Sequence, residues 1–218
     1  MKISDIKLLL IFFISTLFIC CGEDKGTNPV NNEINWPDRT DVEDCLETVM
    51  MSYQHRDIEK YKEVILKPDT NFIFPEGFLW FIPEEDISTG QIEMHVLNYY
   101  QDVAATDSIF HNALELDLDI SCGSWDSLEF FRNKECFDCW KTMREYHIEV
   151  ILDSGDHYIS NMHIRFDVGP DPVTSDKYAI YQVEELISGA GKIISGSEPG
   201  SIIEIKRAFF QYLNDADQ

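Results

Sequence analysis

Four cysteines after residue 40 are the side chains with the most distinctive chemistry in this sequence. They are Cys45, Cys122, Cys136 and Cys139. An even number of cysteines in an exported domain suggests disulfides, and four cysteines allow three connectivities. The simplest arrangement joins Cys122 to Cys136 or Cys139, because the three lie close together in the sequence. Cys45 falls on the apolar stripe of a predicted helix and is expected to be a free, buried thiol.

Two other uses of the cysteines fit the sequence less well. Cys136 and Cys139 have the spacing of a redox dithiol or of half a zinc site. A thioredoxin-like dithiol needs a strand-to-helix turn in a parallel sheet, which the surrounding sequence does not predict. A zinc site needs a second close pair of ligands, and only Cys122 or a distant histidine could supply it. The acidic runs also lack the spacing of a calcium loop. We therefore predict no metal and no cofactor.

The histidines form no recognisable catalytic or metal-binding array. His147 and His163 fall on the strand face opposite the main apolar rows. Pairs such as His163 with Asp167, or His147 with Glu149, share a face and could do acid–base chemistry. An exposed polar row has the same spacing, however, so a solvated surface is the favoured interpretation. No catalytic residue is predicted.

The amino terminus has the features of an export signal. Lys2 and Lys7 precede an apolar run, residues 8–19. This run is shorter than the roughly 20 residues that a membrane-spanning helix needs. It ends at Cys20-Cys21-Gly22, which resembles the lipobox of bacterial lipoproteins, where a cysteine receives acyl chains such as palmitate and becomes the mature amino terminus.

The sequence therefore predicts a lipoprotein signal peptide over residues 1–20, with lipid on Cys21. Cys20 is the alternative site, although the Ile19 before it is large for the signal peptidase. A signal anchor or a buried amino-terminal helix is the other interpretation of this segment.

A flexible tether is predicted to follow the lipid. Residues 21–39 are rich in Asn, Gly and Pro and show no apolar period. Two or three acyl chains would hold the protein on a lipid bilayer effectively permanently. Gly22 stands where a common inner-membrane retention signal has Asp. The expected location is thus the cell envelope, on the outer membrane, either periplasmic or surface-exposed.

Composition excludes one class of partner and predicts one sizeable domain. The formal net charge is -23, so the chain repels nucleic acid, and nucleic-acid binding is excluded. Hydrophobic residues make up 44% and aromatic residues 12% of the chain, which argues against disorder. The domain is expected to span residues 40–218.

Helical spacing dominates the first part of this domain. Thr40 to Glu43 has the pattern of a capping box that opens a helix, and Asp57 is placed to cap a second, short helix that ends before Pro68. Short apolar runs at 72–74 and 78–82 are predicted to be strands or an extended hairpin. A further capping box at 88–91 predicts a helix that continues to about Ala105.

After this point, the apolar residues recur at every second position, the spacing of a β-strand. Apolar and polar residues alternate over 114–120, 146–152 and 158–168, and a fourth apolar run covers 178–187. Helices followed by long antiparallel strands indicate an α+β domain in which the helices cover one face of the sheet.

The residues of this domain resemble a known family. The stretch VEDCLETVMMSYQHRDIEKYKEVILKPDTNFIF (42–74) is similar to the opening of the SnoaL-like branch of the nuclear-transport-factor-two-like superfamily, and YAIYQVEELI (178–187) fits its closing hairpins. The resemblance covers roughly residues 40–213. It implies a cone-shaped fold, in which a curved antiparallel sheet and amino-terminal helices enclose an apolar pocket. Two segments depart from the pattern, an insertion at 121–142 and an extra carboxyl-terminal helix at 201–214.

Two functions remain open, the first suggested by the lipid anchor and tether and the second by the resemblance. Aromatic side chains such as Tyr53, Trp80 and Tyr99 could line the pocket, although aromatics at this spacing more often fill a core. Without a catalytic signature, we expect a non-enzymatic module, membrane-anchored, that binds a small apolar ligand or a protein partner. The alternative is an isomerase or cyclase acting on a small apolar substrate.

Overall fold

The computed structural model describes residues 34–69, 74–86, 91–152, 155 and 157–186. The chain divides into two compact units, residues 1–35 and 36–218, and nearly all described residues belong to the second. The predicted signal peptide, both lipidation candidates and the predicted helix at 201–214 lie outside the described residues. None of the described helices is long and apolar enough to cross a membrane.

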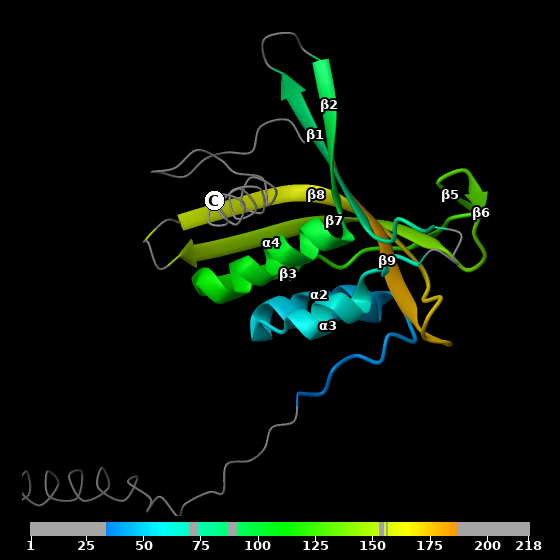
Figure 1. Ribbon diagram of the computed structural model, residues 1–218, viewed down its shortest axis with the longest axis horizontal. Helices are drawn as coiled ribbons and strands as arrows, with labels where there is room; N and C mark the ends of the chain where they lie inside the picture. Colours follow the sequence, from blue (N-terminus) through cyan, green and yellow to red (C-terminus); the bar gives the residue numbers. More distant parts are fainter. Residues whose placement is uncertain (1–33, 70–73, 87–90, 153–154, 156, 187–218) are drawn as a thin grey trace, which may run out of the picture. The chain divides into compact units, whose positions relative to one another are not determined.

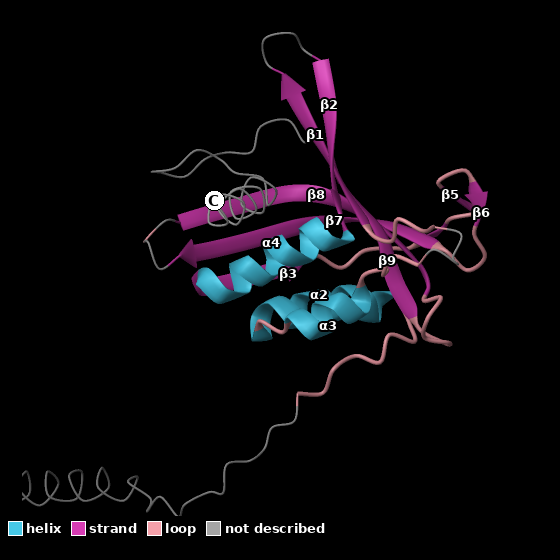
Figure 2. Ribbon diagram, viewed as in Figure 1, coloured by secondary structure: helices cyan, strands magenta, loops and turns pink. Residues whose placement is uncertain are grey.

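The second unit is an α+β domain built on one curved sheet (Figure 1). The strand order is β2-β1-β9-β8-β7-β3, with β4 paired to β7, and β1 runs parallel to β9 while the other pairs are antiparallel. Figure 2 shows the three described helices grouped on one side of this sheet. The predicted fold class is confirmed. The elements are α2 (Val42–His55), α3 (Ile58–Val64), β1 (Leu79–Asp86), β2 (Gln91–Asn98), α4 (Tyr99–Asn112), β3 (Ala113–Ile120), β4 (Asp126–Ser127), β5 (Phe130–Phe131), β6 (Lys134–Glu135), β7 (Trp140–Leu152), β8 (His157–Pro170) and β9 (Tyr178–Leu186).

Helix α2 begins one residue later than predicted. Its capping box is formed by Asp41 and Asp44, not by Thr40 and Glu43. The Thr40 backbone N–H and hydroxyl instead both donate to Asp38 Oδ1. The Asp41 carboxylate accepts from the Glu43 N–H at 2.9 Å, which satisfies one of the free donors at the helix start. Helix α3 is capped by Asp57, as predicted.

The predicted helix over 88–105 is wrong in its first half. Residues Gln91–Asn98 form strand β2, which pairs residue by residue with β1 from Leu79↔Asn98 to Asp86↔Gln91. The helix α4 starts only after Asn98, whose side chain accepts from the Gln101 N–H at 3.1 Å. Pairing with a neighbouring strand thus overrides a local capping pattern, which carries only a small free energy.

A bulge changes the predicted inward face of β3. The register shifts between Ala113 and Glu115, so Ala113 is buried while Leu114 is exposed. After the bulge, Leu118 and Ile120 face the core as the alternating pattern predicts. A bulge has no clear signature in a single strand because it depends on the partner strand.

The core lies between the helices and the inward face of the sheet. On the long strands β7 and β8 the inward positions are regularly spaced, as the period of two predicts. Side chains buried there include Tyr146, Ile148, Val150, Ile164, Phe166 and Val168, and they pack in the same core cluster as Cys45, Leu46, Val49 and Tyr53 of α2.

The segment between β3 and β7 contains a disulfide that differs from the simplest expectation. Cys136 is bonded to Cys139, with their Cα atoms 5.7 Å apart, whereas Cys122 is a free, exposed thiol. The backbone N–H of Ser121, the residue before Cys122, donates to the Glu145 carbonyl on β7. Glu145 comes six residues after Cys139 in the chain. Six extended residues span about 20 Å, beyond the reach of a disulfide. Cys45 is a free, buried thiol, and burial raises its pKa.

A buried arginine connects α2 to β7. The Arg144 side chain is fully buried, and its guanidinium donates to Glu43 Oε2 at 2.7 Å, to Thr142 Oγ1 at 2.7 Å and to the Ser121 carbonyl at 3.0 Å. The Trp125 ring lies 5.3 Å from the guanidinium carbon and also donates to Glu43 Oε2. We call these five residues the Arg144 cluster.

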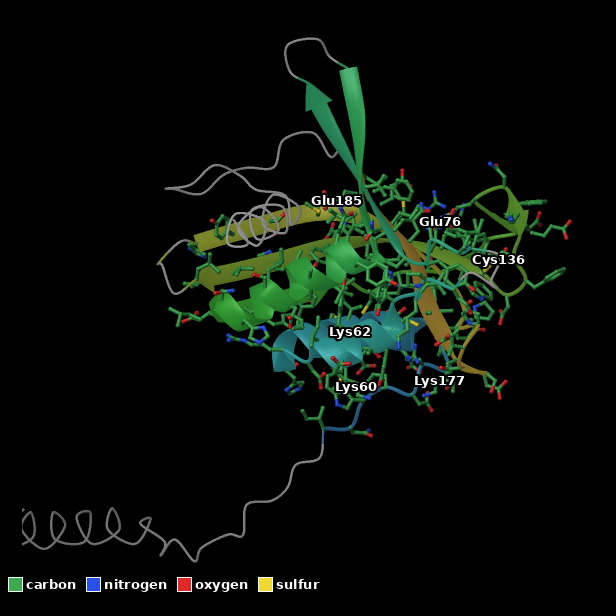
Figure 3. All side chains as sticks on the ribbon, in the orientation of Figure 1. Lys60, Lys62, Glu76, Cys136, Lys177 and Glu185 are labelled. Carbon is green, nitrogen blue, oxygen red and sulfur yellow. A yellow bond between two sulfur atoms is a disulfide. The ribbon has the colours of Figure 1, made fainter. Side chains whose placement is uncertain are left out.

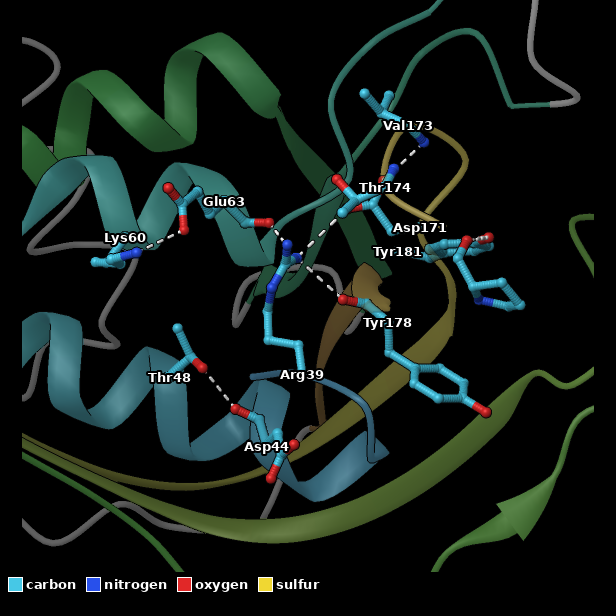
Figure 4. A network of polar contacts seen from close by, with 11 residues as sticks. Arg39, Asp44, Thr48, Lys60, Glu63, Asp171, Val173, Thr174, Tyr178 and Tyr181 are labelled. Atoms are coloured by element: carbon cyan, nitrogen blue, oxygen red, sulfur yellow. Dashed lines mark hydrogen bonds and ion pairs between the residues drawn. The ribbon is translucent and has the colours of Figure 1, made fainter. Parts of the chain in front are cut away.

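A second arginine fastens the start of the domain to its far end (Figure 4). Arg39 is buried, and its Nη1 donates to the carbonyl oxygens of Glu63 and Tyr178 and lies 3.5 Å from Asp171 Oδ2. The Arg39 carbonyl in turn accepts from the Tyr178 N–H at 2.9 Å. The chain just before α2 is therefore tied to the end of α3 and to the start of β9.

Candidate functional site

Polar side chains from five elements meet inside the apolar core. They are Tyr53 of α2, Tyr61 of α3, Asp102 of α4, Tyr146 of β7 and Glu185 of β9, and all five are buried. The Tyr61 hydroxyl donates to Asp102 Oδ2 at 2.6 Å. Tyr146 lies close enough to Tyr53 and Glu185 for both to act on its ionisation. We call these five residues the interior polar cluster; Figure 3 labels Glu185.

The local sequence explains how each element delivers its side chain. Tyr53 continues the buried stripe of α2, and Tyr61 is one of the two buried residues of the short helix α3. Asp102 lies in the first turn of α4, where the helix dipole favours a negative charge. Tyr146 and Glu185 occupy inward positions of their strands.

Burial keeps two tyrosines of this cluster, Tyr61 and Tyr146, protonated. Burial away from water raises the pKa of Tyr61 well above its ordinary value, and the negative charge of the nearby Asp102 carboxylate adds to this effect. Burial also raises the pKa of Tyr146 well above its ordinary value, and electrostatic interactions with Tyr53 and Glu185 raise it further. Protonated hydroxyls are hydrogen-bond donors, so the cluster can offer donors from tyrosine beside acceptors from carboxylate.

One polar atom beside the cluster has an unused hydrogen-bonding capacity. Thr106 is 0% exposed, and its Oγ1 has no hydrogen-bond partner among the residues that the structure describes. Thr106 follows Asp102 by four positions on α4, so both side chains lie on the same helix face. Leaving a buried hydroxyl without a partner costs about 1–3 kcal/mol. This is the kind of group that a bound ligand would satisfy.

The predicted pocket-lining aromatics are all buried in this core. Tyr53 belongs to the interior polar cluster and makes edge-to-face contacts with Tyr61 and Phe110, at centroid distances of 5.8 and 5.0 Å. Trp80 and Tyr99 are also buried, Trp80 beside Phe78.

The sequence prediction missed every other residue of this site: Tyr61, Asp102, Thr106, Tyr146 and Glu185. For Glu185 a signal was present, because it follows the inward Val183 by two positions on a strand. For Asp102 the helical burial pattern was misread, because the predicted helix started too early and a different set of residues was taken as its buried face.

The histidines of β7 and β8 lie on the opposite face of the sheet, and their partners differ from the same-face pairs that the sequence suggested. His147 Nδ1 lies 2.7 Å from Asn161 Oδ1, whereas Glu149 contacts His157 at 2.5 Å. Asp167, the predicted neighbour of His163, is instead held by Arg165 at 2.8 Å. Within the described ranges, no three His, Cys, Asp or Glu side chains are arranged to hold a metal ion.

No family model matches the chain, and no curated protein matches its sequence. Solved structures with similar folds include a protein of Kribbella flavida (12% identity, 68% of this chain and 88% of that one, TM-score 0.46). A nuclear-transport-factor-2-like superfamily protein of Salmonella enterica serovar Typhimurium matches at 11% identity, over 71% of this chain and 92% of that one, with a TM-score of 0.43. A proposed dehydratase of the same family from Streptomyces avermitilis matches at 10% identity, over 70% and 99%, also with a TM-score of 0.43. At TM-scores below 0.5 these likenesses assign neither a family nor an activity to this chain.

Proposed function

We propose that this chain is a lipid-anchored protein of the cell envelope whose domain binds a small, largely apolar ligand at the interior polar cluster. The observation that carries the ligand-binding part is the buried Thr106 hydroxyl without a described partner, on the same helix face as Asp102. Buried carboxylates and hydroxyls cost free energy, and well-packed apolar residues of similar volume often serve stability as well or better. Their convergence from five elements is therefore better explained by recognition.

The chemistry of the cluster limits the ligand. The surrounding core is apolar and aromatic, so most of the ligand surface must be apolar. The tyrosine hydroxyls offer donors and Asp102 offers an acceptor, which suits a molecule carrying one carbonyl or hydroxyl group. Such a ligand could accept from a tyrosine and bond to Thr106 at the same time.

Replacing Thr106 by valine tests this proposal. The full-length protein is purified from membranes, small molecules are extracted with organic solvent, and their amount per protein is measured by mass spectrometry. The wild type is expected to carry a bound molecule, and Thr106→Val to carry at least tenfold less. Once both proteins are freed of ligand, Thr106→Val should melt no lower than the wild type, because the hydroxyl has no described protein partner to lose.

Thr48→Val provides the matched control. Thr48 is a buried threonine of α2 whose hydroxyl bonds to the Asp44 carbonyl at 2.7 Å, outside the interior polar cluster. This variant should keep the ligand. A wild type without any bound molecule, or equal amounts in Thr106→Val and wild type, would contradict the proposal.

The lipid anchor is tested by labelling with radioactive palmitate. The wild type is expected to incorporate label, and Cys21→Ser is expected to lose it, because the thiol is the site of acylation. Cys20→Ser serves as the control and should retain label. Labelling that survives in Cys21→Ser but is lost in Cys20→Ser would move the site to Cys20, and an unlabelled wild type would contradict the anchor.

A second candidate function is favoured by the 2.6 Å contact between Tyr61 and Asp102. A buried carboxylate beside a protonated tyrosine could take a proton from a carbon next to a carbonyl while a tyrosine hydroxyl polarises that carbonyl. The recovered molecule, incubated with the protein in D2O, distinguishes the two functions. Deuterium on carbon that depends on Asp102, and is lost in Asp102→Asn, would indicate an isomerase or cyclase. No incorporation supports binding alone.

A further inference from the structure

A disulfide closes a tight turn just before β7. Only two residues lie between Cys136 and Cys139, which are bonded to each other. The backbone on either side is held independently. The Cys136 N–H donates to the Glu129 carbonyl at 2.9 Å, and the Leu128 N–H donates to the Cys139 carbonyl at 2.7 Å. A disulfide that closes so short a loop restricts the unfolded chain less than one that closes a long loop. Its main effect in the folded protein therefore falls on the two enclosed residues.

Asp138 is the enclosed residue that contacts another part of the fold. Its backbone φ is 60°, in the left-handed region that residues with a side chain adopt only occasionally. In this conformation its carboxylate accepts from the Tyr178 hydroxyl and, at 3.0 Å, from Trp140 Nε1. Phe137, the other enclosed residue, is 84% exposed. The closed ring leaves the turn few conformations and so keeps the Asp138 carboxylate in place for these two bonds.

Tyr178 connects this turn to the buried Arg39 (Figure 4). The Tyr178 N–H donates to the Arg39 carbonyl at 2.9 Å, and Arg39 Nη1 donates to the Tyr178 carbonyl at 3.0 Å. Tyr178 is the first residue of β9, and its cross-strand partner is Pro170, which has no N–H to donate. Because strand pairing is weak at this end, the side-chain bond to Asp138 contributes to holding the Tyr178 backbone in place.

The two sulfur atoms of the disulfide differ in accessibility. Cys139 is 2% exposed, and its Sγ lies so close to Gly169 that a Cβ there would approach it to 2.7 Å. Cys136 is partly exposed. A thiolate can therefore attack Cys136 Sγ, and Cys139 Sγ leaves with the electron pair and takes up a proton. When the attacking group belongs to a dithiol, its second thiolate releases Cys136. The reductant ends as a disulfide, and the protein gains two electrons and two protons.

We infer that the Cys136–Cys139 disulfide is a redox-sensitive switch. Reduction by a dithiol frees the enclosed turn, which releases Asp138 from Tyr178 and loosens the backbone pairing of Tyr178 with Arg39. This role needs no thioredoxin-like parallel sheet, because the disulfide acts on its own chain. It depends neither on a ligand at the interior polar cluster nor on a lipid anchor, since each contact in it joins described residues.

Amide hydrogen–deuterium exchange of the full-length protein, read at single residues by mass spectrometry with electron-transfer fragmentation, tests this inference. The protein is compared before and after reduction with dithiothreitol. Reduction is expected to speed exchange of the Tyr178 N–H at least tenfold, because its bond to the Arg39 carbonyl protects it. The Leu66 N–H donates at 2.9 Å to the carbonyl of Ile180, two residues farther along β9, and its exchange rate should stay within twofold.

Variants identify the groups that transmit the change. In Cys136→Ser/Cys139→Ser, the Tyr178 N–H should exchange as fast as in the reduced wild type and should not respond to dithiothreitol. Tyr178→Phe lacks only the hydroxyl, so its amide should exchange at that fast rate with the disulfide intact. Cys122→Ser removes the free, exposed thiol and is the control, which should respond to reduction as the wild type does.

An exchange rate of the Tyr178 N–H that reduction leaves unchanged would overturn the inference. Equal acceleration at Leu66 would also overturn it, because the whole domain would then be loosened. A response to reduction in Tyr178→Phe as large as in the wild type would show that the hydroxyl does not transmit the change, with the same consequence.

Discussion

Replacing Arg144 by alanine is expected to lower the free energy of unfolding by about 3 kcal/mol, because removing one partner of a buried ion pair typically costs 3–5 kcal/mol. The low end applies here because the Glu43 side chain is 48% exposed, so water can solvate its carboxylate once the guanidinium is gone. The Arg144 side chain itself is fully buried, and its loss also leaves a cavity and deprives Thr142 Oγ1 and the Ser121 carbonyl of a donor. Urea unfolding followed by tryptophan fluorescence measures the change.

An exposed ion pair provides the comparison. Lys60 and Glu63 lie 2.9 Å apart with both side chains partly exposed, and such a pair contributes little. Lys60→Ala should change the unfolding free energy by less than about 0.5 kcal/mol. Equal effects of Lys60→Ala and Arg144→Ala would contradict the importance assigned to the Arg144 cluster.

Replacing Tyr61 by phenylalanine is expected to lower the free energy of unfolding by about 2 kcal/mol, the typical cost of leaving a buried polar group without its partner. The substitution keeps the ring and its edge-to-face contact with Tyr53, and removes only the hydroxyl that donates to Asp102 at 2.6 Å. The Asp102 side chain is buried and is left without this donor. The same urea experiment measures the effect.

Tyr100→Phe is the matched control for this second substitution. Tyr100 follows Tyr99 on α4 and is 69% exposed, so its hydroxyl stays in contact with water after folding. Its loss should leave stability within about 0.5 kcal/mol of the wild type. A Tyr61→Phe protein as stable as Tyr100→Phe would mean that the bond to Asp102 contributes nothing to the fold.

Elements with a strong local signal were predicted correctly from the sequence. Helix α3 has an aspartate cap and a nearby proline, and strands β8, β9 and the second half of β7 have runs with inward apolar residues. The first half of β7, from Trp140, was not predicted. Amphipathic period and capping chemistry are properties of the segment itself, so a single sequence contains them.

Features set by contacts between distant segments were not predictable in the same way. Strand β2 forms because β1 pairs with it, and the bulge at Ala113 depends on the register of β7. The interior polar cluster gathers one residue from each of five elements, so no short motif could encode it. The separation of Cys122 from Cys136 and Cys139 likewise depends on where the end of β3 lies along β7, which only the fold determines.

The bonds of Arg39 also determine how the domain would carry a mechanical load. A pull on the chain before Trp36 would first load the edge-to-face contact of Trp36 with His55 of α2 and then the bonds of Arg39. It would be shared between the Glu63 carbonyl at the end of α3, the Tyr178 backbone at the start of β9, and Asp171 in the loop before it. Drag on a protein held at its amino terminus would thus be transmitted in part to a strand in the middle of the sheet, and not only to the helix that follows the attachment point.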